Sequence, residues 1–128
     1  MNENNPCLFC DKDNLENRII IENDFCYARW DNSPVSNGHA EIVPKKHIES
    51  FFDLDKSQIE QVYSLICDVK NLIQEKYNPD GYNIGINDGE SAGRTIHHLH
   101  IHLIPRYKGD VEDPRGGVRH IIPGKGSY

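Results

Sequence analysis

Four of the seven histidines in this sequence fall within the six residues from His97 to His102, and they carry its strongest chemical signal. In a β-strand alternate side chains share one face, so His98, His100 and His102 would line up while the apolar residues between them enter the core. One interpretation is an ordinary solvated strand face. Otherwise the three imidazoles bind a catalytic metal ion, as in a His₃ zinc site, or one of them acts as a nucleophile helped by its neighbours. His97 has the opposite parity and is predicted to be a structural histidine on the core side.

The cysteines form a second group of interest. Cys7 and Cys10 are separated by two residues, a spacing that lets both thiolates reach one metal ion. Cys26 and Cys67 lie in apolar patterns and are predicted to be buried thiols. The stretch from Met1 to Asn5 has neither the basic nor the apolar region of a secretory signal. We therefore expect a reducing, cytoplasmic location and no disulfides.

The elements that must position these residues are predicted to form an α+β domain, an antiparallel sheet with one long helix. A helix from Asp55 to Tyr77 is predicted because Asp55 and Gln58 have the spacing of a capping box. Strands are predicted at residues 18–22, 25–30, 39–43, 82–87 and 95–105. The apolar residues of the helix recur at three- and four-residue steps on one face: Ile59, Val62, Ile66, Val69 and Ile73.

Length and charge limit the functional classes. A chain of 128 residues is expected to form a single domain over residues 1–128, in which residues 106–128 are a tail without periodicity. The 14 basic and 20 acidic residues give a net charge of −6, which disfavours binding of duplex nucleic acid. Apolar runs are too short for a membrane span. The tail is locally basic, which favours an anionic substrate.

The run His98-Leu99-His100-Ile101-His102-Leu103-Ile104 resembles the signature of the histidine triad (HIT) family. Residues 7–10, 31–39, 44–47 and 87–95 are also similar to segments of that family, in the same order. The resemblance implies a HIT-like fold, with an antiparallel sheet, one long helix and a short helix. It further implies a homodimer and an enzyme that hydrolyses or transfers nucleoside monophosphate groups.

The resemblance also implies roles for individual residues. His100 would be the nucleophile that attacks the α-phosphorus. His102, the Thr95 hydroxyl and backbone N–H groups near Gly93 would stabilise charge on the phosphoryl oxygens. Asp31 would accept hydrogen bonds from the ribose hydroxyls.

Three further positions complete the implied nucleotide site. Asn87 matches an amide that lies on the phosphate side or orients the nucleophile, and His39 matches a histidine that supports the triad. Arg94 departs from the glutamine that many members carry, so it either contacts a polyphosphate or points to solvent. The base pocket is predicted to be apolar, with candidates among Leu8, Phe9, Ile21 and Trp30.

Metal-containing members of the family imply a zinc site. By that similarity Cys7 and Cys10 join His47, which follows the Pro-Lys-Lys motif, and His98. Two thiolates and two imidazoles make a closed tetrahedral site, which is structural and not catalytic.

The preferred hypothesis is a nucleotidyl hydrolase or transferase that cleaves an α-phosphate bond of a dinucleoside polyphosphate or nucleotide conjugate through a nucleotidyl-histidine intermediate. One alternative is a zinc-dependent hydrolase with the histidine cluster as its metal site. The other is a nucleotide-binding regulatory protein with negligible turnover. In the tail, Arg115 and Arg119 are candidates to hold phosphates beyond the α-phosphate.

Overall fold

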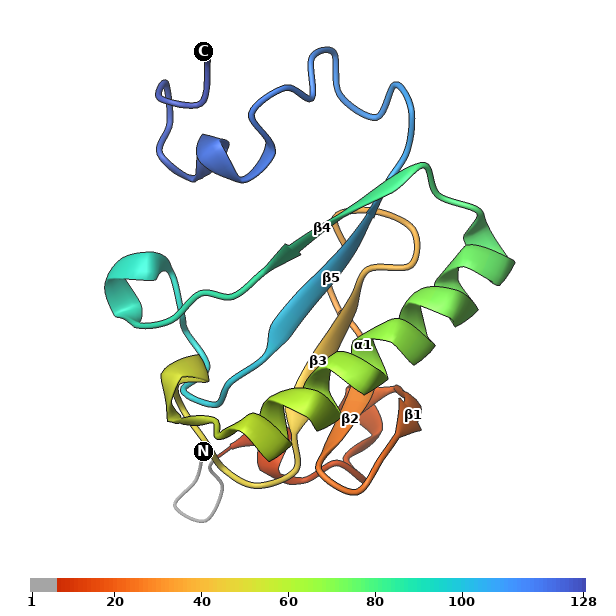
Figure 1. The fold of residues 1–128 in the computed structure, drawn as a ribbon, viewed down its shortest axis with the longest axis vertical. Coiled ribbons are helices and arrows are strands. Elements are labelled where there is room, and N and C mark those ends of the chain that lie inside the picture. The colour runs from red at the N-terminus through yellow and green to blue at the C-terminus, as the bar shows by residue number, and fades with distance from the viewer. Residues whose placement is uncertain (1–6) are drawn as a thin grey trace.

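The computed structural model describes residues 7–128, and the stretch from Met1 to Asn5 considered above lies outside them. Its centre is one antiparallel sheet with the strand order β1-β2-β3-β5-β4 (Figure 1). The predicted α+β fold is confirmed. The strands are β1 (Ile19–Glu22), β2 (Cys26–Trp30), β3 (Ala40–Pro44), β4 (Gly81–Gly85) and β5 (Ile101–Arg106).

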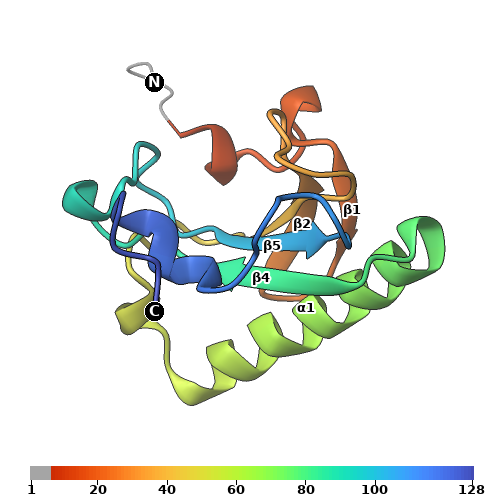
Figure 2. The ribbon, with the colours of Figure 1, turned by 90° about the horizontal axis from the view of Figure 1, so that it is seen from above.

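The helix α1 (Lys56–Tyr77) lies along one face of the sheet (Figure 2). It begins at the predicted capping box, in which the Asp55 side chain accepts from the Gln58 backbone and the Gln58 side chain accepts from the Asp55 backbone. It ends at Asn78, whose left-handed conformation stops the helix. The buried helix positions are Val62, Leu65, Val69 and Ile73. Leu65 was therefore missed by the prediction, and the predicted residues Ile59 and Ile66 are only partly buried.

The two faces of the sheet carry different residues. In β2 and β3, Ala28 and Ile42 face α1 and belong to the main core. Their neighbours face the other way, where Tyr27 packs with Phe9 from the short helix η1 (Leu8–Cys10). The Tyr27 hydroxyl donates to the Phe9 carbonyl at 2.7 Å. The amino-terminal segment therefore covers the face opposite the helix, and the histidine cluster lies on that face.

The last strand is shorter than predicted. β5 begins at Ile101 and not at Thr95, because residues 86–100 form a loop that contains the short helix η4 (Glu90–Ala92). The predicted alternation holds where the strand exists, and Ile101 and Leu103 are buried. It fails before the strand: His97 is exposed, contrary to its predicted core-facing position, and His98 is fully buried.

The other elements are short. The helices η2 (Leu15–Asn17) and η3 (Phe51–Asp53) precede β1 and α1, and the tail contains η5 (Gly117–Ile121), which contacts β4. All four cysteines have free thiols; Cys26 is buried as predicted, whereas Cys67 is half-buried. Within residues 7–128 no helix is long and apolar enough to cross a membrane. The cytoplasmic location and the homodimer stay predictions.

Candidate functional site

A cavity of about 400 Å³ opens on the sheet face opposite α1. Its walls come from the amino-terminal segment, from β2 and β3, from the loop before β5 and from the histidine run. The resemblance to the HIT family singled out residues from most of these segments, and the fold brings most of those residues together here. The lining residues are Leu8, Phe9, Arg29, Asp31, Asn32, Ser33, Glu41, Asn87, Gly93, Arg94, Thr95, Ile96, His100 and His102.

His100 has its tautomer set by the main chain. Its Nδ1 lies 2.8 Å from the carbonyl oxygen of His98, and because a carbonyl only accepts, Nδ1 must carry the proton. The other nitrogen, Nε2, therefore keeps a lone pair. Burial lowers the pKa of His100, so the ring is neutral near pH 7. The Phe9 ring packs edge-on against it at 5.0 Å between ring centroids.

His102 belongs to a chain of hydrogen bonds that begins at the backbone. The Val35 N–H donates to Nδ1 of His39 at 3.2 Å, so the proton of His39 lies on Nε2. That Nε2 is 2.9 Å from Nδ1 of His102, which accepts and leaves Nε2 of His102 with a proton. Burial lowers the pKa of His102 to about 4. A neutral His102 therefore offers an N–H donor.

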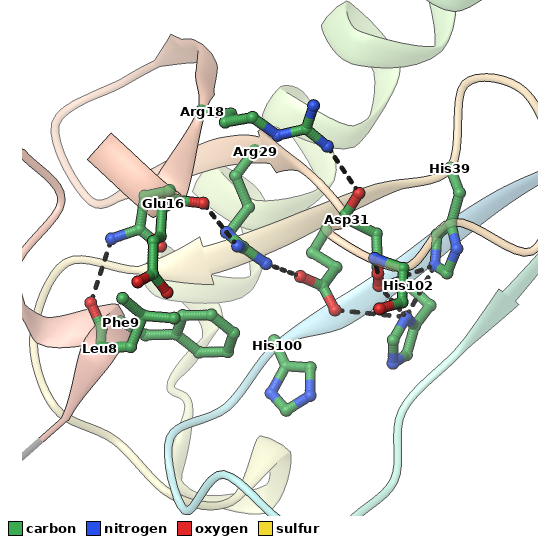
Figure 3. A network of polar contacts seen from close by, with 12 residues as sticks. Leu8, Phe9, Glu16, Arg18, Arg29, Asp31, His39, His100 and His102 are labelled. Atoms are coloured by element: carbon green, nitrogen blue, oxygen red, sulfur yellow. Dashed lines mark hydrogen bonds and ion pairs between the residues drawn. The ribbon is translucent and has the colours of Figure 1, made fainter. Parts of the chain in front are cut away.

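A buried ion pair extends this network and was missed from the sequence. Arg29 and Glu41 face each other across β2 and β3, and Glu41 also pairs in register with His102 of β5. Figure 3 shows Arg29, Asp31 and His102 within this network. The second carboxylate oxygen of Glu41 is 3.5 Å from Nδ1 of His102. Burial, together with the nearby Asp31 carboxylate, raises the pKa of Glu41 to about 7. A sequence signal was available, because each of these charges lies within a strand whose other residues are uncharged.

Arg29 is held by more than its ion pair. Its Nη2 donates to the Glu16 carbonyl at 3.0 Å, and its guanidinium carbon lies 4.9 Å from the centroid of the Phe9 ring. Among residues 7–128 its buried Nε has no hydrogen-bond partner. A buried donor without a partner at a cavity wall is a position where a ligand or water acceptor would be stabilised.

Asp31 follows β2 at the edge of the same network. One carboxylate oxygen accepts from the Ser33 N–H at 2.7 Å, and the other is 3.4 Å from Nε2 of His39. Burial opposes ionisation, but a hydrogen bond with Glu41 and the Ser33 N–H outweigh it and lower the pKa of Asp31. Asp31 is therefore a carboxylate at the cavity wall, as recognition of a diol requires.

The loop before β5 supplies the opposite wall. Gly93 has a φ of 100°, which favours glycine, and it is followed by Arg94 and Thr95 in the lining. Arg94 does not point to solvent: it donates to the Glu49 carbonyl at 3.0 Å and to Nδ1 of His97 at 3.2 Å. Asn87 is exposed at the start of this loop.

The four residues predicted to bind zinc lie together. Donor atoms of Cys7, Cys10, His47 and His98 are all within 4.8 Å of one another. Nε2 of His98 donates to the Pro44 carbonyl at 2.8 Å, so its Nδ1 keeps a lone pair and faces the Cys7 sulfur at 3.2 Å. Two soft sulfurs and two imidazoles match the preference of Zn²⁺.

The three triad histidines His98, His100 and His102 do not gather around one possible metal position. Within the described residues, no group of metal-ligand atoms joins His98 to both His100 and His102. His102 instead groups with Asp31 and His39, and also with Glu41 and His100. The geometry therefore disfavours the alternative of a catalytic metal held by all three triad histidines.

Some predicted residues lie elsewhere. Leu8 and Phe9 line the cavity, but Ile21 packs at the core and Trp30 lines a different cavity. Neither arginine of the tail lines the cavity: the guanidinium groups of Arg115 and Arg119 lie 5.8 and 5.0 Å from the centroid of the Tyr128 ring.

Comparisons with known proteins agree with this geometry. Residues 12–109 match the HIT domain. The chain is 38% identical over 120 residues to an uncharacterized HIT-like protein of Methanocaldococcus jannaschii, covering 90% of this chain and 91% of that protein. It is 32% identical over 98 residues to the bis(5′-adenosyl)-triphosphatase of Dictyostelium discoideum, covering 77% and 66%. A crystal structure of a Zn-bound histidine triad family protein from Mycobacterium smegmatis matches with a TM-score of 0.72 and 30% identity, covering 81% and 77%. The chain therefore belongs to the histidine triad family.

Proposed function

We propose that this protein hydrolyses or transfers a nucleoside monophosphate group, taken from a dinucleoside polyphosphate or another nucleotide conjugate. The observation that carries the proposal is the tautomer of His100, whose Nδ1 proton is held by the His98 carbonyl so that Nε2 keeps its lone pair. Similarity to a bis(5′-adenosyl)-triphosphatase supports the substrate class.

In the proposed first step, Nε2 of His100 attacks the α-phosphorus. A P–N bond forms, the bond from phosphorus to the leaving oxygen breaks, and the leaving group departs with the electron pair. In the second step water attacks the same phosphorus, the P–N bond breaks and the water proton is released. Two displacements replace one difficult displacement, which is the advantage of a covalent intermediate.

The surrounding groups have matching roles in this proposal. The Nε2–H of neutral His102 donates to a non-bridging phosphoryl oxygen, where negative charge is held in the transition state. The backbone near Gly93 and the Thr95 hydroxyl add donors from the opposite wall. Asp31 accepts from the ribose hydroxyls. Phe9 and Leu8 supply the apolar surface for the base.

We propose a structural zinc ion held by Cys7, Cys10, His47 and His98. The donor set and the Pro44 carbonyl behind His98 support it, as does similarity to a Zn-bound family member. The ion would tie the amino-terminal segment, which carries Phe9, to the loop that carries His100. It would supply folding energy and no chemistry to the reaction.

The experiment that tests the function compares His100→Ala with His97→Gln, a control in the same histidine run that lies outside the cavity. Diadenosine triphosphate is the substrate. We expect His100→Ala to lose on the order of 10³-fold or more in kcat while it still binds adenosine monophosphate, because a nucleophile acts mainly in the transition state.

Mass spectrometry of the wild-type protein after rapid acid quench should find one adenylyl group on His100. Turnover within tenfold of wild type in His100→Ala would refute the role of His100. Nucleotide binding without turnover or adduct in the wild type would instead favour the regulatory alternative, and loss of turnover on chelation without unfolding would favour the metal hydrolase.

A further inference from the structure

A second cavity, the rear cavity, lies behind His39. It has a volume of about 280 Å³ and is lined by Arg18, Trp30, His39, Lys76 and Tyr77, among others. Side chains alternate along β2, so Trp30 faces the α1 side while Arg29 faces the candidate site. His39 lines the rear cavity and its contact His102 lines the candidate site, so these two rings lie between the cavities together with Asp31, which lines both.

The rear cavity has an unusual charge for an acidic protein. The net charge of the chain is −6, yet this cavity carries two cations, and within residues 7–128 neither Arg18 nor Lys76 forms an ion pair with a carboxylate. The one acid in the lining, Asp31, directs its carboxylate to Ser33 and His39. With Asp31 ionised, the lining still has two cations against one carboxylate, so an anion in this cavity would meet an excess of positive charge.

Backbone geometry holds Arg18 over the cavity. Arg18 has a φ of 29°, an uncommon conformation for a residue with a side chain, and the register between β1 and β2 shifts directly after it. Its Nη2 donates to the Asp31 carbonyl at 2.8 Å (Figure 3), and Trp30 N donates to the Arg18 carbonyl at 3.2 Å. Four of the five guanidinium N–H groups are left for another acceptor.

Two aromatic rings form the rest of the pocket. Trp30 and Tyr77 meet edge to face at 6.3 Å between centroids, and both are half-buried. The Lys76 ammonium lies 5.6 Å from the Trp30 centroid and 5.3 Å from the Tyr77 centroid, so it faces both rings. The rings offer stacking surface beside two cations.

The walls are firmly built. Gly38 has a φ of 89°, and a Cβ there would approach the Tyr77 ring to 2.9 Å, so the loop backbone packs directly against that ring. The same loop is tied to the end of β5, because Ser36 Oγ donates to the Pro105 carbonyl at 2.7 Å and the Tyr107 hydroxyl donates to the Asn37 carbonyl at 2.6 Å. The cavity exists before any ligand arrives, which lowers the entropic cost of binding.

We propose that the rear cavity is a second ligand site that binds a nucleoside monophosphate, with the base against Trp30 and Tyr77 and the phosphate between Arg18 and Lys76. An occupant needs a planar ring and an anion at one end to satisfy both parts of the lining, and a nucleoside monophosphate has both. The proposal requires binding only, so it does not depend on the reaction proposed for His100.

Trp30 makes the site directly measurable, because it is the single tryptophan of the chain and it does not line the candidate site. The probe is adenosine monophosphate, titrated against tryptophan fluorescence. We compare the wild type with Lys76→Gln and with Lys70→Gln, an exposed lysine on the same helix outside the cavity. The kcat/KM for diadenosine triphosphate is measured for each variant.

We expect a saturable fluorescence change whose Kd rises about tenfold or more in Lys76→Gln, the loss of one charge-assisted contact, and stays within about twofold in Lys70→Gln. The kcat/KM should be unaffected in both variants. Inorganic phosphate alone and adenosine alone should each bind at least about tenfold more weakly than adenosine monophosphate.

Three results would overturn the proposal. The first is the absence of a fluorescence change at millimolar adenosine monophosphate. The second is an equal Kd in wild type and Lys76→Gln, which would place the signal in the candidate site. The third is inorganic phosphate binding as tightly as the nucleotide, which would reduce the rear cavity to a bare anion site. None of these results bears on whether His100 forms an adduct.

Discussion

The hydrogen bond from His39 to His102 gives the sharpest test of how the triad is oriented. His39 is 4% exposed and joins two partners, accepting from Val35 N at 3.2 Å and contacting Nδ1 of His102 at 2.9 Å. If His102 donates to the phosphoryl group through Nε2, its Nδ1 must accept, and His39 is the donor 2.9 Å away. Removing His39 should therefore free His102 to rotate or change tautomer.

The expected losses of activity and stability follow from these two contacts of His39. In His39→Ala, one buried acceptor on His102 loses its donor, which costs about 1–3 kcal/mol in transition-state stabilisation, or about 5- to 150-fold in kcat/KM. The backbone N–H of Val35 also loses its acceptor, which lowers the free energy of unfolding by a similar amount. Steady-state kinetics and urea unfolding measure the two effects separately.

Two conservative variants separate the donor role of His39 towards His102 from its acceptor role towards Val35. The amide nitrogen of glutamine is the same number of bonds from Cγ as Nε2 of histidine. His39→Gln can therefore donate to His102. An asparagine amide matches Nδ1, so His39→Asn can accept only from Val35. We expect His39→Gln to stay within about tenfold of wild-type kcat/KM and His39→Asn to fall to the level of His39→Ala. Equal activity of the two variants, or wild-type activity in His39→Ala, would refute the proposed orientation of His102.

Three further predictions concern the zinc, the pH dependence and the tail. Cys10→Ser should lower zinc content and the Tm, whereas Cys26→Ser should keep its zinc; elemental analysis decides, and full zinc content in Cys10→Ser would exclude the proposed site. The pKa of His102 falls from 6.5 to about 4 on folding. As the pH falls, this histidine is therefore protonated in the unfolded state at a higher pH than in the folded state. The stability from this group is complete above pH 6.5 and lost towards pH 4, by about 3 kcal/mol, and urea unfolding of His102→Gln should lack that part of the decline. The double variant Arg115→Ala/Arg119→Ala should keep kcat/KM for diadenosine triphosphate within about twofold, since neither side chain lines the cavity; a tenfold loss would restore their predicted phosphate role.

The sequence was most informative where local chemistry decides the structure. The capping box at Asp55 and Gln58 predicted the start of α1, because a cap depends only on residues within one turn. The start of β5 could not be predicted in this way. The residues from His98 onward alternate like a strand, but the Leu99 N–H donates to the Ile48 carbonyl, outside the sheet, at 2.7 Å. Strand pairing depends on distant partners, and alternation alone does not reveal them.

In the candidate site, too, some residues could be predicted from the sequence alone and others depend on distant strand partners. Residue types and order were enough to select His39, Asp31 and the histidine run, since the family resemblance rests on them. Arg29 and Glu41 were missed because their importance arises from register: β2 and β3 place them opposite each other, and β5 places His102 next to Glu41. Buried charges in this arrangement need partners on adjacent strands, and only the fold identifies those partners.

The main chain explains how two histidines of one run could have the different roles that we propose for them. His98 donates through Nε2 to the Pro44 carbonyl, so its Nδ1 lone pair faces the cysteine sulfurs. His100 donates through Nδ1 to the His98 carbonyl, so its Nε2 lone pair is the one left for the proposed attack on phosphorus. The two side chains are chemically identical and two residues apart, and a backbone carbonyl determines which nitrogen of each can act. A substitution that moved either carbonyl would therefore change the chemistry of a histidine without replacing it.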